Sequence, residues 1–190
     1  MLFIVMHKVD AATEAGLPPD PQLVANMGAL IGETIEKGLF HNAAGLKGSA
    51  QRIRLRWRGG KRELTRGPLS GENELVAGLA MLQVKSLDEA VAWTTRIAEI
   101  EGCHDVEFDL GPLVESWDLG FEPKPTGDIP LRVLAVRKAD SHSEAGTAPS
   151  AEIMTKMQAL LSEMKAAGVL LAVEGLKPSA RGARLQTRAG

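Results

Sequence analysis

The sequence predicts an α+β fold, and three kinds of pattern indicate it. Residues 52–58 and 104–110 alternate between apolar and polar side chains, as half-buried strands do. Residues 20–38 carry apolar side chains at spacings of three and four, as an amphipathic helix does. A second helix is predicted after the capping box that Ser86 and Glu89 form. Strands and helices therefore alternate along one chain of globular composition, with 44% apolar and 24% charged residues.

The order of these elements limits the number of folds that the chain can adopt. The chain offers, in order, a strand at 2–9, a helix from Asp20 to Gly38, a strand at 39–43, a hairpin at 52–65 turning at Gly59-Gly60, an apolar strand at 75–84, a helix to about residue 100 and a strand at 104–110. An antiparallel sheet with helices on one face, of the ferredoxin-like kind, packs this order economically. The other face needs a cover, and we expect a second sheet, face to face, within or between chains.

An internal repeat organises the chain. When the numbering is shifted by 130, residues 1–60 and 131–190 align without a gap and are identical at 20 of 60 positions. The identities include Lys8/Lys138, Asp10/Asp140, Glu14/Glu144 and Gly38/Gly168. The alignment predicts strands at 131–136, 169–173 and 183–187, and a helix that Ser150 caps. Residues 61–130 have no second copy, so the chain is one and a half units.

The repeat predicts the domain organisation. We expect a full domain at 1–121, a linker at 122–130 and a truncated βαββ repeat at 131–190. Four prolines between residues 111 and 130 favour an extended linker. A fragment of 60 residues buries too little surface to be stable alone and leaves strand edges open. We therefore expect it to pack on the first unit or on a partner chain.

Composition excludes several classes of function. The net charge is −2, and the apolar start 1–6 lacks the basic leader of a signal peptide. No apolar run reaches the length of a membrane span, so a soluble, cytoplasmic protein is expected. The single cysteine, Cys103, precludes an internal disulfide, and no second pair accompanies Cys103-His104 at metal spacing. No P-loop, Gly-x-Gly-x-x-Gly or Gly-x-Ser-x-Gly pattern occurs, and we expect no cofactor and no metal.

The hairpin carries an unusual charge. Residues 52–66 hold seven basic residues and one acidic residue. On a strand, Arg52, Arg54, Arg56 and Arg58 share one face. They could bind phosphates or an acidic partner, or they could form a solvated face that pairs with the acidic remainder of the chain. Aromatic residues are scarce and tyrosine is absent, so nucleic-acid binding is only a distant alternative.

Several segments resemble the YCII-related, DGPF-motif family. The stretches that carry the resemblance are 74–79, 83–90 with Trp93, Glu174-Gly-Leu-Lys-Pro-Ser179 and Gly182-Ala-Arg184. The family implies a dimeric α/β barrel in which ferredoxin-like units pair sheet to sheet. Most of its members have no established activity, and distant relatives are isomerases and dehalogenases. The family's Asp-Gly-Pro-Phe loop stands here as Arg66-Gly67-Pro68-Leu69, and its Glu-Gly-Leu-x-Pro-Ser segment begins with Ala44 in the full copy.

Candidate site residues follow from position and from the resemblance. His7 lies near Asp10 and could act as a general base, although a partly exposed structural histidine is the simpler interpretation. The catalytic candidates are His7, Asp10 and Arg66; the candidate ligand-binding residues are Lys8, Asp10, Arg66, Gly67, Pro68, Lys138, Asp140 and Glu174. We expect a non-catalytic or weakly ligand-binding assembly module that forms a homodimer. The alternative is an isomerase or lyase acting on a small anionic substrate between sheet and helix.

Overall fold

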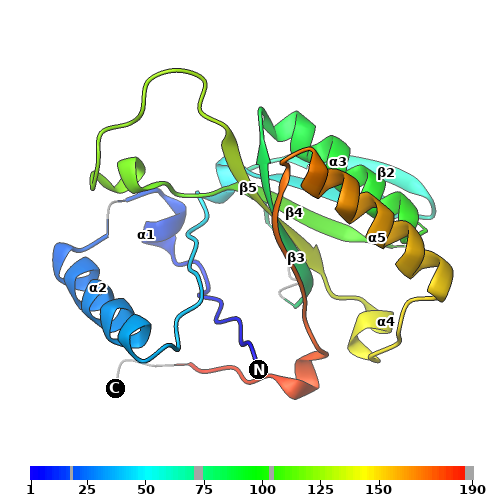
Figure 1. The fold of residues 1–190 in the computed structure, drawn as a ribbon, viewed down its shortest axis with the longest axis horizontal. Coiled ribbons are helices and arrows are strands. Elements are labelled where there is room, and N and C mark those ends of the chain that lie inside the picture. The colour runs from blue at the N-terminus through cyan, green and yellow to red at the C-terminus, as the bar shows by residue number, and fades with distance from the viewer. Residues whose placement is uncertain (18, 71–74, 103–104, 187–190) are drawn as a thin grey trace.

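The structure is a computed structural model that describes residues 1–17, 19–70, 75–102 and 105–186. Six strands form one antiparallel sheet in the order β2-β1-β4-β5-β3-β6 (Figure 1). The strands are β1 (Ile53–Arg58), β2 (Lys61–Arg66), β3 (Val76–Val84), β4 (Glu107–Pro112), β5 (Leu131–Lys138) and β6 (Leu170–Gly175). The longer helices are α2 (Pro21–Glu36), α3 (Leu87–Ile100) and α5 (Ala151–Ala166), and the short ones are α1 (Ala11–Glu14) and α4 (Ser141–Glu144). The predicted α+β class with an antiparallel sheet is confirmed.

Two β-α-β units interlock in this sheet. One is β3-α3-β4 and the other is β5-α5-β6, and β5 lies between β4 and β3. Helices α3 and α5 cover the same face of the sheet, and the hydrophobic core lies between them and the strands (Figure 1). This arrangement is compatible with a ferredoxin-like unit. The β1–β2 hairpin extends the sheet beyond β4.

The strand patterns explain which side chains enter the core. On β1, Ile53, Leu55 and Trp57 are buried, and the arginines between them point to the opposite face. On β4, Phe108 and Leu110 are buried, while Glu107 and Asp109 take the other face. These alternations confirm the predicted hairpin and last strand, although β4 begins at Glu107. Helix α3 begins where Ser86 accepts a hydrogen bond from the Glu89 amide, as the capping box predicts.

Strand β2 is one edge of the sheet. All six of its side chains are exposed, and four of them are charged: Lys61, Arg62, Glu63 and Arg66. It pairs with β1 alone, so that Arg66 lies opposite Ile53 and shares the helix-covered face with it.

Residues 1–44, called here the N-terminal segment, differ most from expectation. Helix α2 forms, with Asp20 as its cap and Gly38 at φ 65°, but residues 2–9 and 39–43 form no strand. The two strand predictions are therefore wrong. A strand exists only where a neighbouring edge accepts its backbone hydrogen bonds, and β5 already occupies the position between β4 and β3. The apolar stripe of α2 is exposed, as Leu23 at 54% and Ile35 at 56% show.

Residues 131–174, called here the inserted segment, do join the sheet. The strand predicted at 131–136 is present as β5, and the one at 169–173 is present as β6. Both lie edge to edge with strands of residues 53–112 in a single sheet and do not cover its face. The strand predicted at 183–187 is wrong for residues 183–186, which have no neighbouring strand; residue 187 lies outside the described residues. No helix among the described residues is both long and apolar enough to cross a membrane.

Candidate functional site

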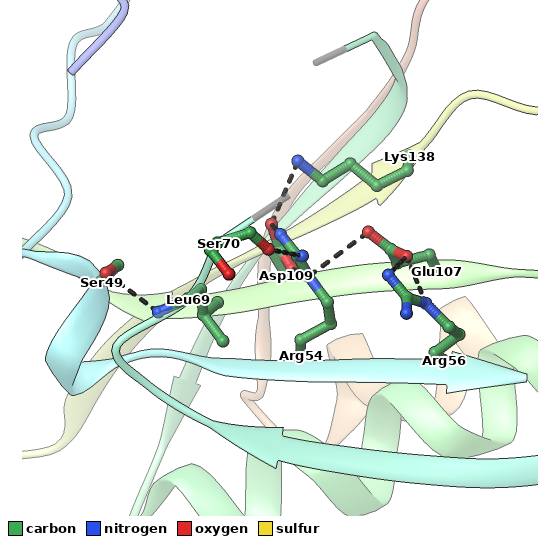
Figure 2. A network of polar contacts seen from close by, with 8 residues as sticks. All are labelled: Ser49, Arg54, Arg56, Leu69, Ser70, Glu107, Asp109 and Lys138. Atoms are coloured by element: carbon green, nitrogen blue, oxygen red, sulfur yellow. Dashed lines mark hydrogen bonds and ion pairs between the residues drawn. The ribbon is translucent and has the colours of Figure 1, made fainter. Parts of the chain in front are cut away.

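A network of charged side chains lies on the sheet face that the helices leave open. It joins Arg54 and Arg56 of β1, Glu107 and Asp109 of β4, and Lys138 at the end of β5 (Figure 2). The antiparallel register places Arg54 opposite Asp109 and Arg56 opposite Glu107. Because directly opposite residues share a face, each basic side chain meets an acidic one.

The contacts in this network are short and directional. Arg54 donates from Nε to Oδ1 of Asp109 at 2.7 Å and from Nη2 to Oδ2 at 2.9 Å, a two-point pair. Lys138 Nζ lies 3.0 Å from Oδ2 of the same carboxylate. Arg56 donates from Nε to Oε2 of Glu107 at 2.6 Å. The Arg54, Asp109 and Lys138 side chains are only 13–14% exposed, so solvent screens their charges little.

Asp109 is the centre of the network. Burial alone would raise the pKa of its carboxyl, but the hydrogen bond from Arg54 and the charge of Lys138 outweigh burial and lower that pKa. The hydrogen bond to Asp109 in turn raises the pKa of Arg54. Asp109 is therefore held as a carboxylate, with its acceptor oxygens already occupied by the two cations.

An open polar pocket of about 650 Å³ adjoins this network. Its lining has three cationic and two acidic side chains, together with two uncharged residues: Arg56, Arg58, Lys138, Asp105, Glu107, Trp57 and Ala139. The excess of positive charge suits a small anion. The chemistry that this arrangement supports is binding, because the cations and the hydrogen-bonding groups surround an open volume.

The loop after β2 lies against the start of β1. The Gly67 amide donates to the Arg52 carbonyl at 2.9 Å. The Leu69 amide donates to Ser49 Oγ at 3.0 Å (Figure 2). A Cβ on Gly67 would lie 1.8 Å from the Ser49 carbonyl oxygen, so only glycine fits this approach. Arg66, at the start of the loop, pairs with Asp88 of α3 at 2.8 Å.

One carboxylate contact recurs at the 130-residue offset. Glu14 accepts hydrogen bonds from the amide and the hydroxyl of Ser49. Glu144 accepts the corresponding bonds from the amide and the hydroxyl of Ser179. Both glutamates precede a left-handed glycine by two residues, Gly16 at φ 69° and Gly146 at φ 68°. The Glu-x-Gly pattern thus places a carboxylate that fixes a distant serine as well as a turn.

The predicted site residues do not form a single cleft. His7, Lys8 and Asp10 lie on the exposed N-terminal segment, where Asp10 caps α1 by accepting from the Thr13 amide at 2.7 Å. Arg66, with Gly67 and Pro68 after it, begins the loop at the end of β2 and faces the helix side. The structure therefore separates Arg66 from the network on the open face.

The candidates of the inserted segment are divided as well. Lys138 belongs to the network, and Asp140 pairs with Arg137 at 2.8 Å while capping α4. Arg137 also reaches Glu101, the residue that follows α3, at 2.8 Å. Glu174 is exposed on the edge strand β6. The structure thus brings only Lys138, among the predicted residues, into the network and its pocket.

Sequence reasoning missed the acidic half of the network. The alternation of residues 104–110 placed Glu107 and Asp109 away from the core, which is a usable signal. The pairing of β1 with β4 was the missing information, because these strands are about 50 residues apart in sequence. The structure pairs Arg54 and Arg56 with these acids, as the second interpretation of the arginine hairpin expects, but Arg54 is only 13% exposed, so the face is not solvated there. Cys103 and His104 lie outside the described residues, and within the described part no cluster of three metal-ligating side chains is present.

Comparison with known proteins gives one finding. The family model of the YCII-related domain matches residues 1–107, which is more than half of the 190-residue chain. Neither the search of curated proteins nor the search of solved structures gave a match. The chain belongs to the YCII-related domain family.

Proposed function

We propose that this YCII-related protein is a non-catalytic assembly module that forms a homodimer. One observation carries the proposal: the N-terminal segment exposes a long apolar surface that a single chain does not bury. Phe3 is 73% exposed, Val5 85%, and Leu39 73%, and the helix between them exposes its apolar stripe. Many exposed apolar side chains concentrated in one segment are typical of interaction sites in soluble proteins.

The open face of the sheet supports the same proposal. Leu79 and Met81 of β3 lie opposite Val136 and Leu134 of β5, and all four alternate with buried residues on the helix-covered face. They are half-buried apolar side chains next to the charged network. A second sheet packed face to face would cover them, which is the homodimer contact expected from the family resemblance.

The repeat supports an assembly role in a further way. We propose that residues 131–190 are the front half of a second YCII-related unit, and that they complete the sheet of the first. The two regions share their caps, their left-handed glycines and the glutamate-to-serine contact. A segment whose strands complete another unit's sheet has a structural role.

The placement of the candidate residues favours binding and assembly over catalysis. His7 and Asp10 stand on the exposed segment, and Arg66 is engaged by Asp88 on the helix side. The carboxylates of the open face are engaged by Arg54, Arg56 and Lys138. A general base needs its acceptor directed at a substrate proton, and these carboxylates are directed at cations instead.

Sedimentation velocity over a range of concentrations tests the proposal. We expect a dimer for the native chain and a monomer for the double variant Phe3→Asp and Val5→Asp. Leu185→Asp is the matched control, because Leu185 is 95% exposed outside the N-terminal segment. We expect this control to remain dimeric. A native chain that stays monomeric at all concentrations would refute the proposal.

The polar pocket favours a second candidate function, the binding of a small anion. Lys138 lines this pocket, and it is the one predicted ligand-binding residue there. A thermal-shift screen with small carboxylic acids and lactones tests the idea. We expect Lys138→Met to abolish any shift and Arg66→Ala, on the other face, to leave it intact. A shift that survives Lys138→Met would remove the pocket as the site.

A further inference from the structure

We infer that the N-terminal segment of one chain docks into the groove between β4 and β3 of a second copy. In this structure β5 of the same chain's inserted segment fills that groove, while α5 covers the sheet and β6 pairs with the far side of β3. The inference rests on the proposed homodimer and assigns the position at which the exposed segment binds. At equivalent positions the N-terminal segment has side chains that could make the contacts that the inserted segment makes.

The apolar contacts can be made by either segment. Val133 and Ala135 of β5 face the core with 0% and 2% exposure, and Leu160 of α5 with 4%. Their equivalents at an offset of 130 are Phe3, Val5 and Leu30, all apolar and all more than half exposed. Transfer of these side chains to the groove would remove them from water, while displacement would expose Val133, Ala135 and Leu160, so the apolar areas gained and lost largely offset each other.

The polar contacts are also preserved. The inserted segment reaches its neighbours through Lys138 to Asp109 at 3.0 Å, through Glu163 to Arg96 at 2.7 Å and through Arg137 to Glu101 at 2.8 Å. In the N-terminal segment, the residue equivalent to Lys138 is also a lysine, Lys8, and the residue equivalent to Glu163 is also a glutamate, Glu33. The residue equivalent to Arg137 is His7, which can also pair with a carboxylate.

The N-terminal segment already has the local shape of the inserted segment. Asp10 and Asp140 each cap a four-residue helix, and Gly38 and Gly168 each end a 16-residue helix at φ 65° and φ 71°. Docking therefore requires new strand pairing but no new helix. Such preorganisation lowers the entropy that binding costs.

The anchoring of residues 45–49 indicates a second copy as the partner. Leu46 bridges Leu113 beyond β4, the Val114 amide donates to the Gly45 carbonyl, and Ser49 is held against Gly67. The equivalent of Gly45 is Gly175, directly after the inserted segment, and it lies opposite Gly78 on the far side of β3. These two positions are about four strand spacings apart, ~19 Å across the sheet. The anchors thus keep the segment from its own groove but leave it able to reach another chain's.

Each chain has one groove between β4 and β3, and either the N-terminal segment or the inserted segment can occupy it. Docking in a second copy therefore displaces that copy's inserted segment, and the two segments compete. Cross-strand disulfides report which segment occupies the groove. Met81 and Leu134 are directly opposite on β3 and β5, at a separation that a disulfide can span, and the equivalent of Leu134 is Ile4.

The experiment uses the full chain with Cys103→Ser in every variant. Met81→Cys with Leu134→Cys reports the inserted segment, and Met81→Cys with Ile4→Cys reports the N-terminal segment. The matched control is Met81→Cys with Phe3→Cys, because neighbouring strand residues point to opposite faces. Val133→Asp is added to each pair to weaken the inserted segment, and Val133→Ala is the milder form of the same change.

We expect Val133→Asp to give a dimer-sized disulfide species through Ile4 and Met81, about tenfold above the Phe3 control because the control side chain faces the wrong side of the sheet. Val133→Ala should raise the same yield to a smaller extent. A monomer-sized Ile4–Met81 disulfide would show docking within one chain and overturn the inference. Absence of the disulfide in both variants, including through unfolding, would also overturn it. If the disulfide is absent but the native chain sediments as a dimer, only the docking inference is overturned and the proposed function stands. If the native chain is a monomer, both the inference and the proposed function are refuted.

Discussion

The N-terminal segment and the inserted segment have matching sequence patterns and opposite environments. Leu160 is 4% exposed and its counterpart Leu30 is 52% exposed; Val133 is fully buried and its counterpart Phe3 is 73% exposed. Local features agree in both segments, down to the capping aspartates and the helix-ending glycines. Only the long-range features differ, namely strand pairing and burial. Strand formation in this protein is therefore decided by which edges are free, and helix formation by the local sequence.

Identical truncations in the two helices should separate the segments most clearly. Leu160→Ala should lower the free energy of unfolding by about 2–5 kcal/mol, the cost of a cavity in a packed core. Leu30→Ala should change it by less than about 0.5 kcal/mol, as exposed substitutions do. Urea denaturation at low protein concentration measures both values. Equal losses in the two variants would mean that the segments are equally buried in solution.

Loss of the Asp109 carboxylate should have the next largest effect. Asp109→Asn leaves Arg54 and Lys138 partly buried without their anion, and should cost about 2–4 kcal/mol at pH 7. The pKa of Asp109 is lowered in the folded protein, so its contribution is present above the unfolded value, about pH 4, and is lost as pH falls through the folded value. Stability measured from pH 7 to pH 2 should therefore converge for the native chain and the variant. A gap that stays constant over this range would contradict the assignment.

The two equivalent lysines provide a third comparison. Lys138→Met removes a charged hydrogen bond to Asp109 and should cost about 1–2 kcal/mol. Lys8→Met, on the exposed segment, should stay within about 0.5 kcal/mol. Thermal unfolding of the two variants, read against the native chain, measures the difference. The comparison fails if Lys8→Met proves the more destabilising change.

The two capping aspartates should differ least. Asp140→Ala removes a helix cap and the partner of Arg137 and should cost about 0.5–2 kcal/mol. Asp10→Ala removes the same kind of cap from a short exposed helix, and we expect no change in global unfolding, because that helix contains no buried residue. Hydrogen exchange should nevertheless show faster local opening at residues 11–14. Unchanged exchange there would contradict the role of Asp10 as a cap.

Much of the fold could be predicted from the sequence, and the reasons are local. Alternation fixed the buried faces of β1 and β4, and capping residues fixed the starts of α2, α3 and α5. The predictions of strands at 2–9 and 39–43 were wrong because the same sequence pattern occurs twice in the chain, whereas the sheet has only one position for the strands that it predicts. No local rule decides which copy takes that position.

The candidate site was less predictable. Lys138 was identified through the repeat, but its partner Asp109 lies on a strand whose register with β1 and β5 depends on the whole sheet. Arg66 was expected to line a cleft between sheet and helix together with His7, Lys8 and Asp10. It does lie on the helix side, opposite Ile53, whereas the other three lie on the exposed N-terminal segment. Side-chain alternation gives the face of each residue, whereas the identity of the residue beside it requires the strand order.

The charged β2 strand has a consequence for how copies of this protein can meet. A strand at the border of a sheet offers unpaired amides and carbonyls to any passing chain and invites uncontrolled stacking. Here Lys61, Arg62 and Arg66 line that border, and a second copy approaching in the same way would bring like charges together. Charge repulsion therefore opposes edge-to-edge association through β2, and the other edge strand, β6, is less protected against it.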